Sequence, residues 1–184
     1  MADLIIKPTS GNLLIKDDQD ATRLTVATST GATTLTNQVF PAGHTIQTKF
    51  AQIAKSIAAI TTQNDDTEVD SGLRIDFTPV SSTSKIIFTF HAGNAIAQSG
   101  DLLLSIKYHT TSNTAPNTDF GTNYTSGDRQ GATAQIFTFN HMHFVDSWSG
   151  LRCVSPCYGS SNGNSVCISN ATHVTFFRID EIAQ

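Results

Sequence analysis

The hydrophobic positions of residues 67–184 recur with a period of two, which is typical of β-strands. Leu73, Ile75 and Phe77 alternate with polar residues, so this run predicts a strand with one buried face. Further strand-length runs follow, separated by polar turns. They cover residues 85–90, 101–108, 135–145, 150–158, 165–168 and 173–180. Strands at near-regular spacing predict an all-β head domain, a β-sandwich or jelly roll.

Residues 1–36 form a separate block with shorter apolar runs. These runs lie at 3–7, 12–16, 22–26 and 33–35, and turn residues follow each of them. Each predicted strand carries only two or three large apolar side chains, so the block cannot bury a core of its own. We therefore predict a short β-hairpin block that serves as an anchor or shaft. It would pack against copies of itself or against another protein.

Pro41 and Gly43 interrupt any strand that continues through residues 37–43, so we predict a joint there and one head domain over residues 44–184. Residues 44–62 allow two interpretations. Four apolar residues at helical spacing favour an amphipathic helix, whereas the flanking threonine pairs and the β pattern downstream favour a strand. We predict the strand.

The composition supports β-structure and narrows the set of partners. The 184 residues are 39% hydrophobic and only 14% charged, and they include 26 Thr and 18 Ser. Threonine favours strands because its branched Cβ fits a pleated surface. The net charge is −4 and no cluster of Lys and Arg occurs, so we expect no nucleic-acid partner. We also expect no membrane insertion and no signal peptide, hence synthesis and assembly in a cytoplasm.

Three cysteines lie close together, at Cys153, Cys157 and Cys167. Their number is odd and a cytoplasm is reducing, so we predict free, packed thiols without a structural disulfide. A zinc site would need more ligands at tighter spacing. We predict no cofactor.

Several short motifs resemble the small fibre domains of marine tailed bacteriophages. Residues 73–90 combine a strand, a Thr-Pro step, a Ser-rich turn and a Ser-Lys-Ile strand start, as those domains do. Residues 101–108 resemble the strand that follows there, residues 143–147 resemble the aromatic and Asp-Ser segment, and residues 175–182 resemble the last strand with its Glu-Ile pair. Residues 11–26 are similar to the repeated hairpins of phage fibre shafts. Trp148, where a proline is common, and the cysteine cluster depart from this pattern.

The resemblance implies a trimeric virion fibre or knob. We predict a structural tail fibre that forms a homotrimer, binds other virion proteins through its N-terminal block and attaches to the host surface, with glycan as a candidate receptor. A capsid-bound decorating fibre is the alternative. A lectin-like module and a glycan depolymerase are less favoured.

An enzyme is not expected. The sequence contains no P-loop or HExxH motif. Asp180 and Glu181 are neighbours on a predicted strand, so their carboxylates point to opposite faces and cannot flank one glycosidic bond. The acidic segment 65–70 lacks the spacing of a calcium loop.

Receptor contacts are expected in the polar loops 110–131 and 146–164, because loops can vary without unfolding a domain. The candidates are Asn113, Asn117, Asp119, Asn123, Tyr124, Trp148 and Tyr158, with Phe120 as a further aromatic. Rings that stack on sugars, with amides beside them, suit a glycan. Trp148 and Tyr158 equally suit a cap on the hydrophobic core.

His141 and His143 are the one pair with the spacing of metal ligands. Residues two apart on a strand share a face, so three copies around an axis would offer six imidazoles to a metal ion. The alternative interpretation is a pair of ordinary histidines beside two phenylalanines.

Overall fold

The computed structural model of the chain is all-β and divides into two compact units, residues 1–40 and 41–184. The structure describes residues 13–16, 19, 22–26, 33–35, 41–62, 67–97, 102–120, 125–127, 135–163, 165–168 and 174–184. Within these residues there is no α-helix, so the predicted all-β class is confirmed. No helix in this part of the chain is long and apolar enough to span a membrane.

The first unit contains a three-stranded antiparallel sheet in the order β1-β2-β3. Its strands are β1 (Leu13–Lys16), β2 (Thr22–Val26) and β3 (Thr33–Leu35). On β1, Leu14 is 46% exposed and Ile15 is 51% exposed. Because neighbouring strand residues point to opposite faces, the sheet exposes a large aliphatic side chain on each side. The predicted run at 3–7 lies outside the described residues.

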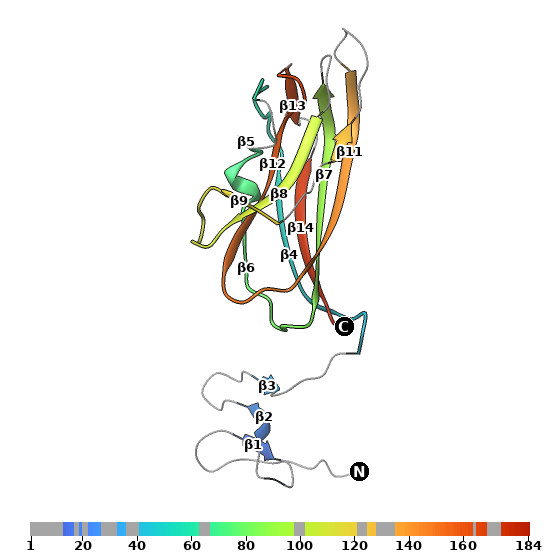
Figure 1. The fold of residues 1–184 in the computed structure, drawn as a ribbon. Helices are drawn as coiled ribbons and strands as arrows, with labels where there is room; N and C mark the ends of the chain where they lie inside the picture. The colour runs from blue at the N-terminus through green and yellow to red at the C-terminus, as the bar shows by residue number, and fades with distance from the viewer. Residues whose placement is uncertain are drawn as a thin grey trace. The chain divides into compact units, whose positions relative to one another are not determined.

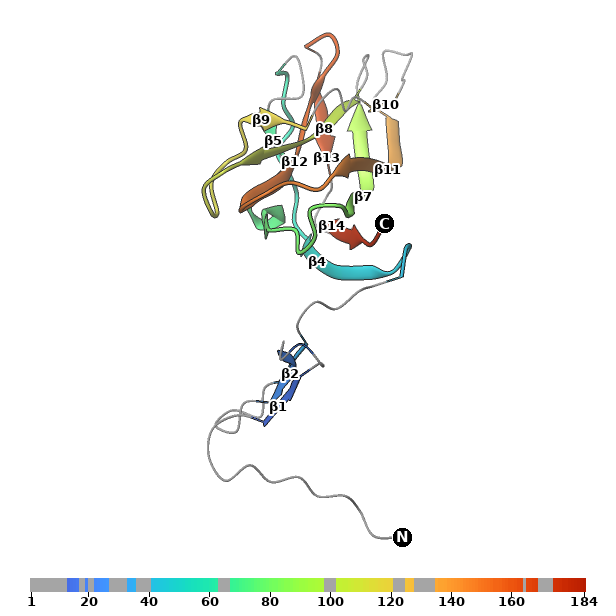
Figure 2. The ribbon, with the colours of Figure 1, turned by 60° about the horizontal axis from the view of Figure 1, so that its bottom comes forward.

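The second unit contains two sheets that face each other (Figures 1 and 2). The β12 sheet has the order β10-β8-β12-β5, with β6 also on β12 and β9 also on β8. Its strands are β5 (Thr67–Glu68), β6 (Ile75–Phe77), β8 (Leu102–His109), β9 (Thr118–Asp119), β10 (Thr125–Gly127) and β12 (Arg152–Ser160). The polar segment 110–131 was predicted to be a loop, but β9 and β10 pair with the edge of β8. That part of the prediction is wrong.

The β7 sheet has the order β11-β7-β14-β4, with β13 also on β7. Its strands are β4 (Thr45–Ile53), β7 (Lys85–Ala97), β11 (Gln135–Asp146), β13 (Val166–Ile168) and β14 (Thr175–Ile182). Residues 45–53 are therefore a strand, as predicted. The rest of the ambiguous segment up to 62 forms only one isolated bridge, between Ile60 and Val166.

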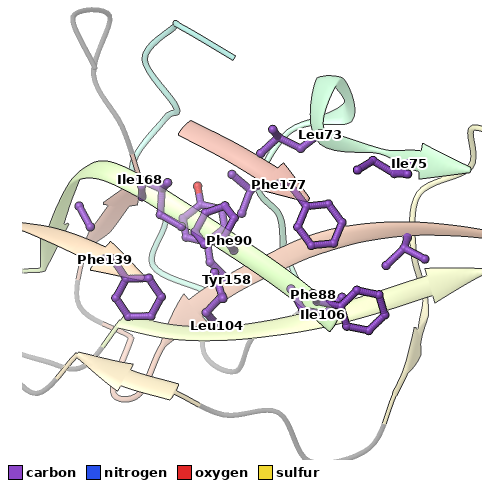
Figure 3. Close-up of a cluster of buried hydrophobic side chains, with 14 of the residues drawn as sticks. Leu73, Ile75, Phe88, Phe90, Leu104, Ile106, Phe139, Tyr158, Ile168 and Phe177 are labelled. Atoms are coloured by element: carbon purple, nitrogen blue, oxygen red, sulfur yellow. The ribbon is translucent and has the colours of Figure 1, made fainter. Parts of the chain in front are cut away.

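One hydrophobic core fills the space between the two sheets (Figure 3). The β7 sheet contributes Phe88, Phe90 and Phe177, and the β12 sheet contributes Leu104 and Ile106. All five side chains are fully buried. Shared burial of this kind is consistent with the predicted β-sandwich.

The chain enters the second unit at the end where it also finishes. The N–H of Gly43 donates to the carbonyl of Ala183 at 2.8 Å, and Ile182 pairs with Lys85 at the start of β7. The N–H of Ser147 donates to Ser84 O at 3.2 Å. This entry end therefore holds both the turn before β7 and the turn after β11 (Figure 1). The opposite, far end holds the end of β7, the starts of β8 and β11, and the end of β12.

Candidate functional site

A buried carboxylate organises the entry end. Glu181 on β14 is fully buried, and its two oxygens accept hydrogen bonds from the N–H groups of Val80 (2.9 Å) and Ser81 (2.8 Å). They also accept from the hydroxyl of Ser84 (2.6 Å) and the amide of Gln47 (2.7 Å). The Ser-rich turn and the Glu-Ile pair, which are about a hundred residues apart in the chain, are thus parts of one structure.

The hydrogen bonds to Glu181 keep its carboxylate charged. Burial opposes ionisation, but donors from Ser84, Val80, Ser81 and Gln47 outweigh it and lower the pKa of Glu181. A carboxylate with four donors has no lone pair left for a substrate proton. Glu181 therefore holds the turn and is not available as an acid catalyst.

An aromatic cluster lies beside this turn. Trp148 packs against Phe77 and Phe120, with ring centroids 5.8 and 5.2 Å away. The guanidinium of Arg152 lies over the rings of Tyr108 (4.0 Å), Trp148 (4.9 Å) and Phe120. Burial lowers the pKa of Arg152, and cation–π contact with the rings compensates for the lost water. The interpretation of Trp148 as a cap on the core fits this position.

A pocket of about 290 Å³ lies between the two turns of the entry end. Its lining is uncharged and consists of Pro79, Val80, Ser81, Ser82, Ser147, Trp148, Ser149 and Gly150. The indole N–H of Trp148 and the hydroxyl of Ser147 have no hydrogen-bond partner among the described residues. A lining of serine hydroxyls beside an indole ring suits a neutral polyol better than an ion.

Trp148 was predicted as a receptor contact. Its turn follows β11 at the entry end of the second unit. Receptor contact by Trp148 stays a prediction.

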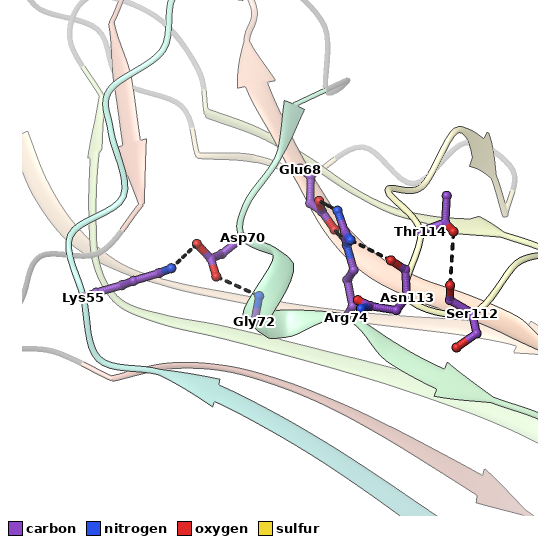
Figure 4. A network of polar contacts seen from close by, with 8 residues as sticks. All are labelled: Lys55, Glu68, Asp70, Gly72, Arg74, Ser112, Asn113 and Thr114. Carbon is purple, nitrogen blue, oxygen red and sulfur yellow. Dashed lines mark hydrogen bonds and ion pairs between the residues drawn. The ribbon is translucent and has the colours of Figure 1, made fainter.

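Asn113, Asn117 and Asp119 lie in the segment after β8, and each has a structural contact. Figure 4 shows the contacts of Asn113. Asn113 has φ of +49°, its carbonyl accepts from Arg74 at 2.8 Å and its N–H donates to Asp76 at 3.1 Å. Asparagine tolerates this left-handed conformation better than most residues. The N–H of Asn117 donates to a carbonyl of β8, and Asp119 pairs with a buried lysine of β8 at 3.3 Å. Receptor contact by these three residues stays a prediction.

Tyr158 is in the core and not on a loop. It lies near the end of β12, is 1% exposed, and its hydroxyl donates to Ala58 O at 2.9 Å. A ring in this position cannot stack on a sugar, so the prediction of Tyr158 as a receptor contact is wrong. Asn123 and Tyr124 lie outside the described residues.

His141 and His143 share a face of β11, but this face points inward. Their rings stack with centroids 6.2 Å apart, and His143 also stacks on Phe88 at 6.3 Å. Burial lowers the pKa of both, that of His141 to about 4 with a smaller effect from His143. This arrangement fits ordinary core histidines better than outward imidazoles around an axis. The described residues contain no group of three or more His, Cys, Asp or Glu side chains that suits a metal.

Cys153 and Cys157 are buried on the outward side of β12, and neither has a disulfide assigned. Burial raises the pKa of Cys153, as does its hydrogen bond to Asp76. Both side chains are packed, as predicted. The side chain of Cys167 lies outside the description.

The sequence analysis missed one surface, the outer face of the β7 sheet. Its large apolar side chains are Phe50, Ile87, Met142, Phe144, Phe176 and Ile182. Three of them, Phe50, Met142 and Phe144, are more than half exposed. The signal was present in pairs of neighbouring apolar residues, such as Phe176 and Phe177, which give a strand two apolar faces.

No protein-family model and no curated protein matches this chain.

Proposed function

We propose that this chain is a non-enzymatic structural protein of a bacteriophage virion, a homotrimeric tail fibre that attaches to the host surface. The observation that carries the proposal is the sheet of the first unit. Leu14 and Ile15 are about half exposed on opposite faces of this small sheet, and a sheet of this size is not stable alone. Copies of the chain around a common axis would cover such strands, as in a fibre shaft.

The strand order of the second unit supports a jelly roll. In that fold the first, eighth, third and sixth strands form one sheet, and the second, seventh, fourth and fifth form the other. The order β4-β14-β7-β11 fits the first sheet. The order β5-β12-β8-β10 fits the second, if β6 continues β5 and β9 belongs with β10 along the edge of β8. Jelly rolls are common in viral structural proteins.

The contacts of Glu181 support the resemblance to phage fibre domains. The Thr-Pro and Ser-rich turn and the terminal Glu-Ile pair are separate motifs in the sequence. In this fold the glutamate accepts the turn's N–H groups, so each motif requires the other. Motifs that are linked in this way are expected to occur together in related domains.

The position of the carboxylates favours a structural role over a glycosidase. Asp180 accepts from Thr48 at 2.6 Å and pairs with Arg178 at 2.7 Å on the outer face of the β7 sheet. Glu181 points inward and has four donors. The two groups cannot act on one bond.

Receptor contact is assigned to the far end of the second unit. The chain enters the second unit at Pro41, and we assign receptor contact to the opposite end of that unit. Of the predicted loops, 160–163 lies there, with exposed side chains at Ser161 and Asn162. Weak contacts in three copies would add through multivalency.

Competition of the purified chain with phage adsorption tests this function. A tail fibre is expected to inhibit adsorption of the virion to host cells in a dose-dependent way. Immunogold labelling of the virion should place the chain on the tail. Labelling of the capsid with no effect on adsorption would favour a decorating fibre, and cleavage of host polysaccharide would favour a depolymerase.

A further inference from the structure

The outer face of the β7 sheet consists of cross-strand rows that mix large apolar and polar side chains. One row runs Phe144–Ile87–Asp180–Thr48 across β11, β7, β14 and β4. The next runs Met142–Thr89–Arg178–Phe50, and the third runs Asn140–His91–Phe176–Gln52. The apolar residues of neighbouring rows approach one another, as Phe50 and Phe176 do with centroids 5.5 Å apart. This is the composition of a protein interface, apolar with interspersed polar groups.

The charged groups of this face, and several of its neutral polar groups, are already paired with each other. Asp180 accepts from Thr48 and Arg178, and His91 Nδ1 lies 2.7 Å from Asn140 Oδ1. At the edge, Lys85 pairs with Asp146. Polar groups with partners can lose water at little cost, whereas unpaired ones cannot. The face can therefore be covered without leaving a charge alone.

The charge of the face indicates what covers it. Each of its cations has an anion from the same chain, Arg178 with Asp180 and Lys85 with Asp146. A neutral face has no attraction for nucleic acid or for an anionic lipid surface. It also has no net charge with which to repel its own copy.

We infer that the outer face of the β7 sheet is the subunit interface of the second unit, and that a second copy of this chain covers it. This inference rests on the proposed homotrimer. The first unit has exposed aliphatic side chains on both faces of its sheet and is tethered to the second. Copies that associate through one unit bring the other units together at high effective concentration. Three β7 sheets turned towards one axis would bury all three faces.

Two substitutions of similar chemistry test the interface in the full chain. Phe144→Lys places a charge on the face, and Val80→Lys places one on an exposed turn outside it. Light scattering during dilution is expected to show the Phe144→Lys trimer dissociating at a concentration at least tenfold higher than the wild type. The Val80→Lys trimer should behave like the wild type. If the wild type is a trimer and both variants dissociate at the same concentration, the inferred interface is overturned but the homotrimer is not. If the wild type is a monomer, the homotrimer itself is overturned.

A photo-crosslinking residue keeps the test decisive if Phe144→Lys does not fold. Benzoylphenylalanine at position 144 preserves an aromatic ring, and irradiation is expected to give covalent dimers and trimers of the chain. The same residue at position 80 should give none. Crosslinks absent at 144 in a trimer, or equal at both positions, would overturn the inference.

Discussion

The two sheets of the second unit present different outer faces to their surroundings. On the β12 sheet, the outward side chains of β12 are small, Cys153, Ser155 and Cys157, and all three are fully buried. The segment after β8 covers part of this face, where Asn113 binds Arg74 and Asp76. The outward side chains of the β7 sheet are large, and several are more than half exposed.

The size and polarity of the outward side chains explain this difference between the two sheets. Small, polar outward residues let the chain fold its own segment over the β12 sheet, with charged hydrogen bonds that fix it. Large apolar outward residues have no such cover in the described chain. Contiguous exposed apolar patches mark interaction surfaces. We therefore expect changes to the first face to affect folding and changes to the second to affect assembly.

The largest effect on folding is expected for Glu181→Gln, which touches neither outer face. A glutamine offers one acceptor oxygen and two donors to a site that holds four donors. Buried, unsatisfied groups should lower the free energy of unfolding by about 3 kcal/mol, measured by urea denaturation. The oligomeric state of the folded fraction should not change. A loss below about 1 kcal/mol would contradict the assigned role of this carboxylate.

A somewhat smaller effect is expected for Arg74→Met on the covered face. Arg74 binds Glu68 through two hydrogen bonds of 2.8 and 2.6 Å and also holds Asn113 O. Both charged side chains are less than a fifth exposed, so we expect a loss of about 2 kcal/mol. Lys85→Met, which removes a well-exposed pair on the other sheet, is the control and should change stability little. Equal losses of stability for the two variants would mean that the hydrogen bonds of Arg74 do not hold the segment after β8 on the β12 sheet.

Stability should fall as the pH decreases from about 6.5 towards 4. Folding lowers the pKa of His141 to about 4, so the unfolded chain binds more protons in this window. At pH 5 the loss is at most about 2 kcal/mol relative to pH 7, and His143 acts in the same direction. His141→Leu should flatten the pH dependence measured by thermal denaturation. An unchanged profile would contradict the inward, buried position of this ring.

The smallest effect is expected for reductant, because neither Cys153 nor Cys157 has a disulfide assigned. The melting temperature should not change when dithiothreitol is added. A decrease of several degrees would reveal a disulfide, since losing a native one costs about 2 to 5 kcal/mol.

Local alternation predicted the class of the fold but not its long-range pairing. The alternation of Leu73, Ile75 and Phe77 predicted a strand, and β6 covers Ile75–Phe77, whereas Leu73 ends a 3-10 helix, Ser71–Leu73. β9 and β10 carry little hydrophobic signal, and they are strands only because the edge of β8 offers hydrogen-bonding groups. The helical spacing from Phe50 to Ile60 was misleading, since Phe50 points outward on β4.

The candidate site depended on topology that a single sequence does not carry. Tyr158 ends the predicted strand 150–158, next to a glycine and serine turn, so it was predicted as a receptor contact. In the structure β12 continues to Ser160 and the ring is buried. Trp148 is correctly placed on a turn, yet the connection of strands puts this turn at the entry end. The partners of Glu181 are about a hundred residues away in the chain, which no local pattern indicates.

The mass of the full chain in solution tests the central claim most directly. The account predicts a homotrimer, three times 19.7 kDa, by multi-angle light scattering at micromolar concentration. Both the exposed strands of the first unit and the outer face of the β7 sheet would then be covered by copies. A stable monomer of 19.7 kDa with the same β-rich circular dichroism would contradict the account.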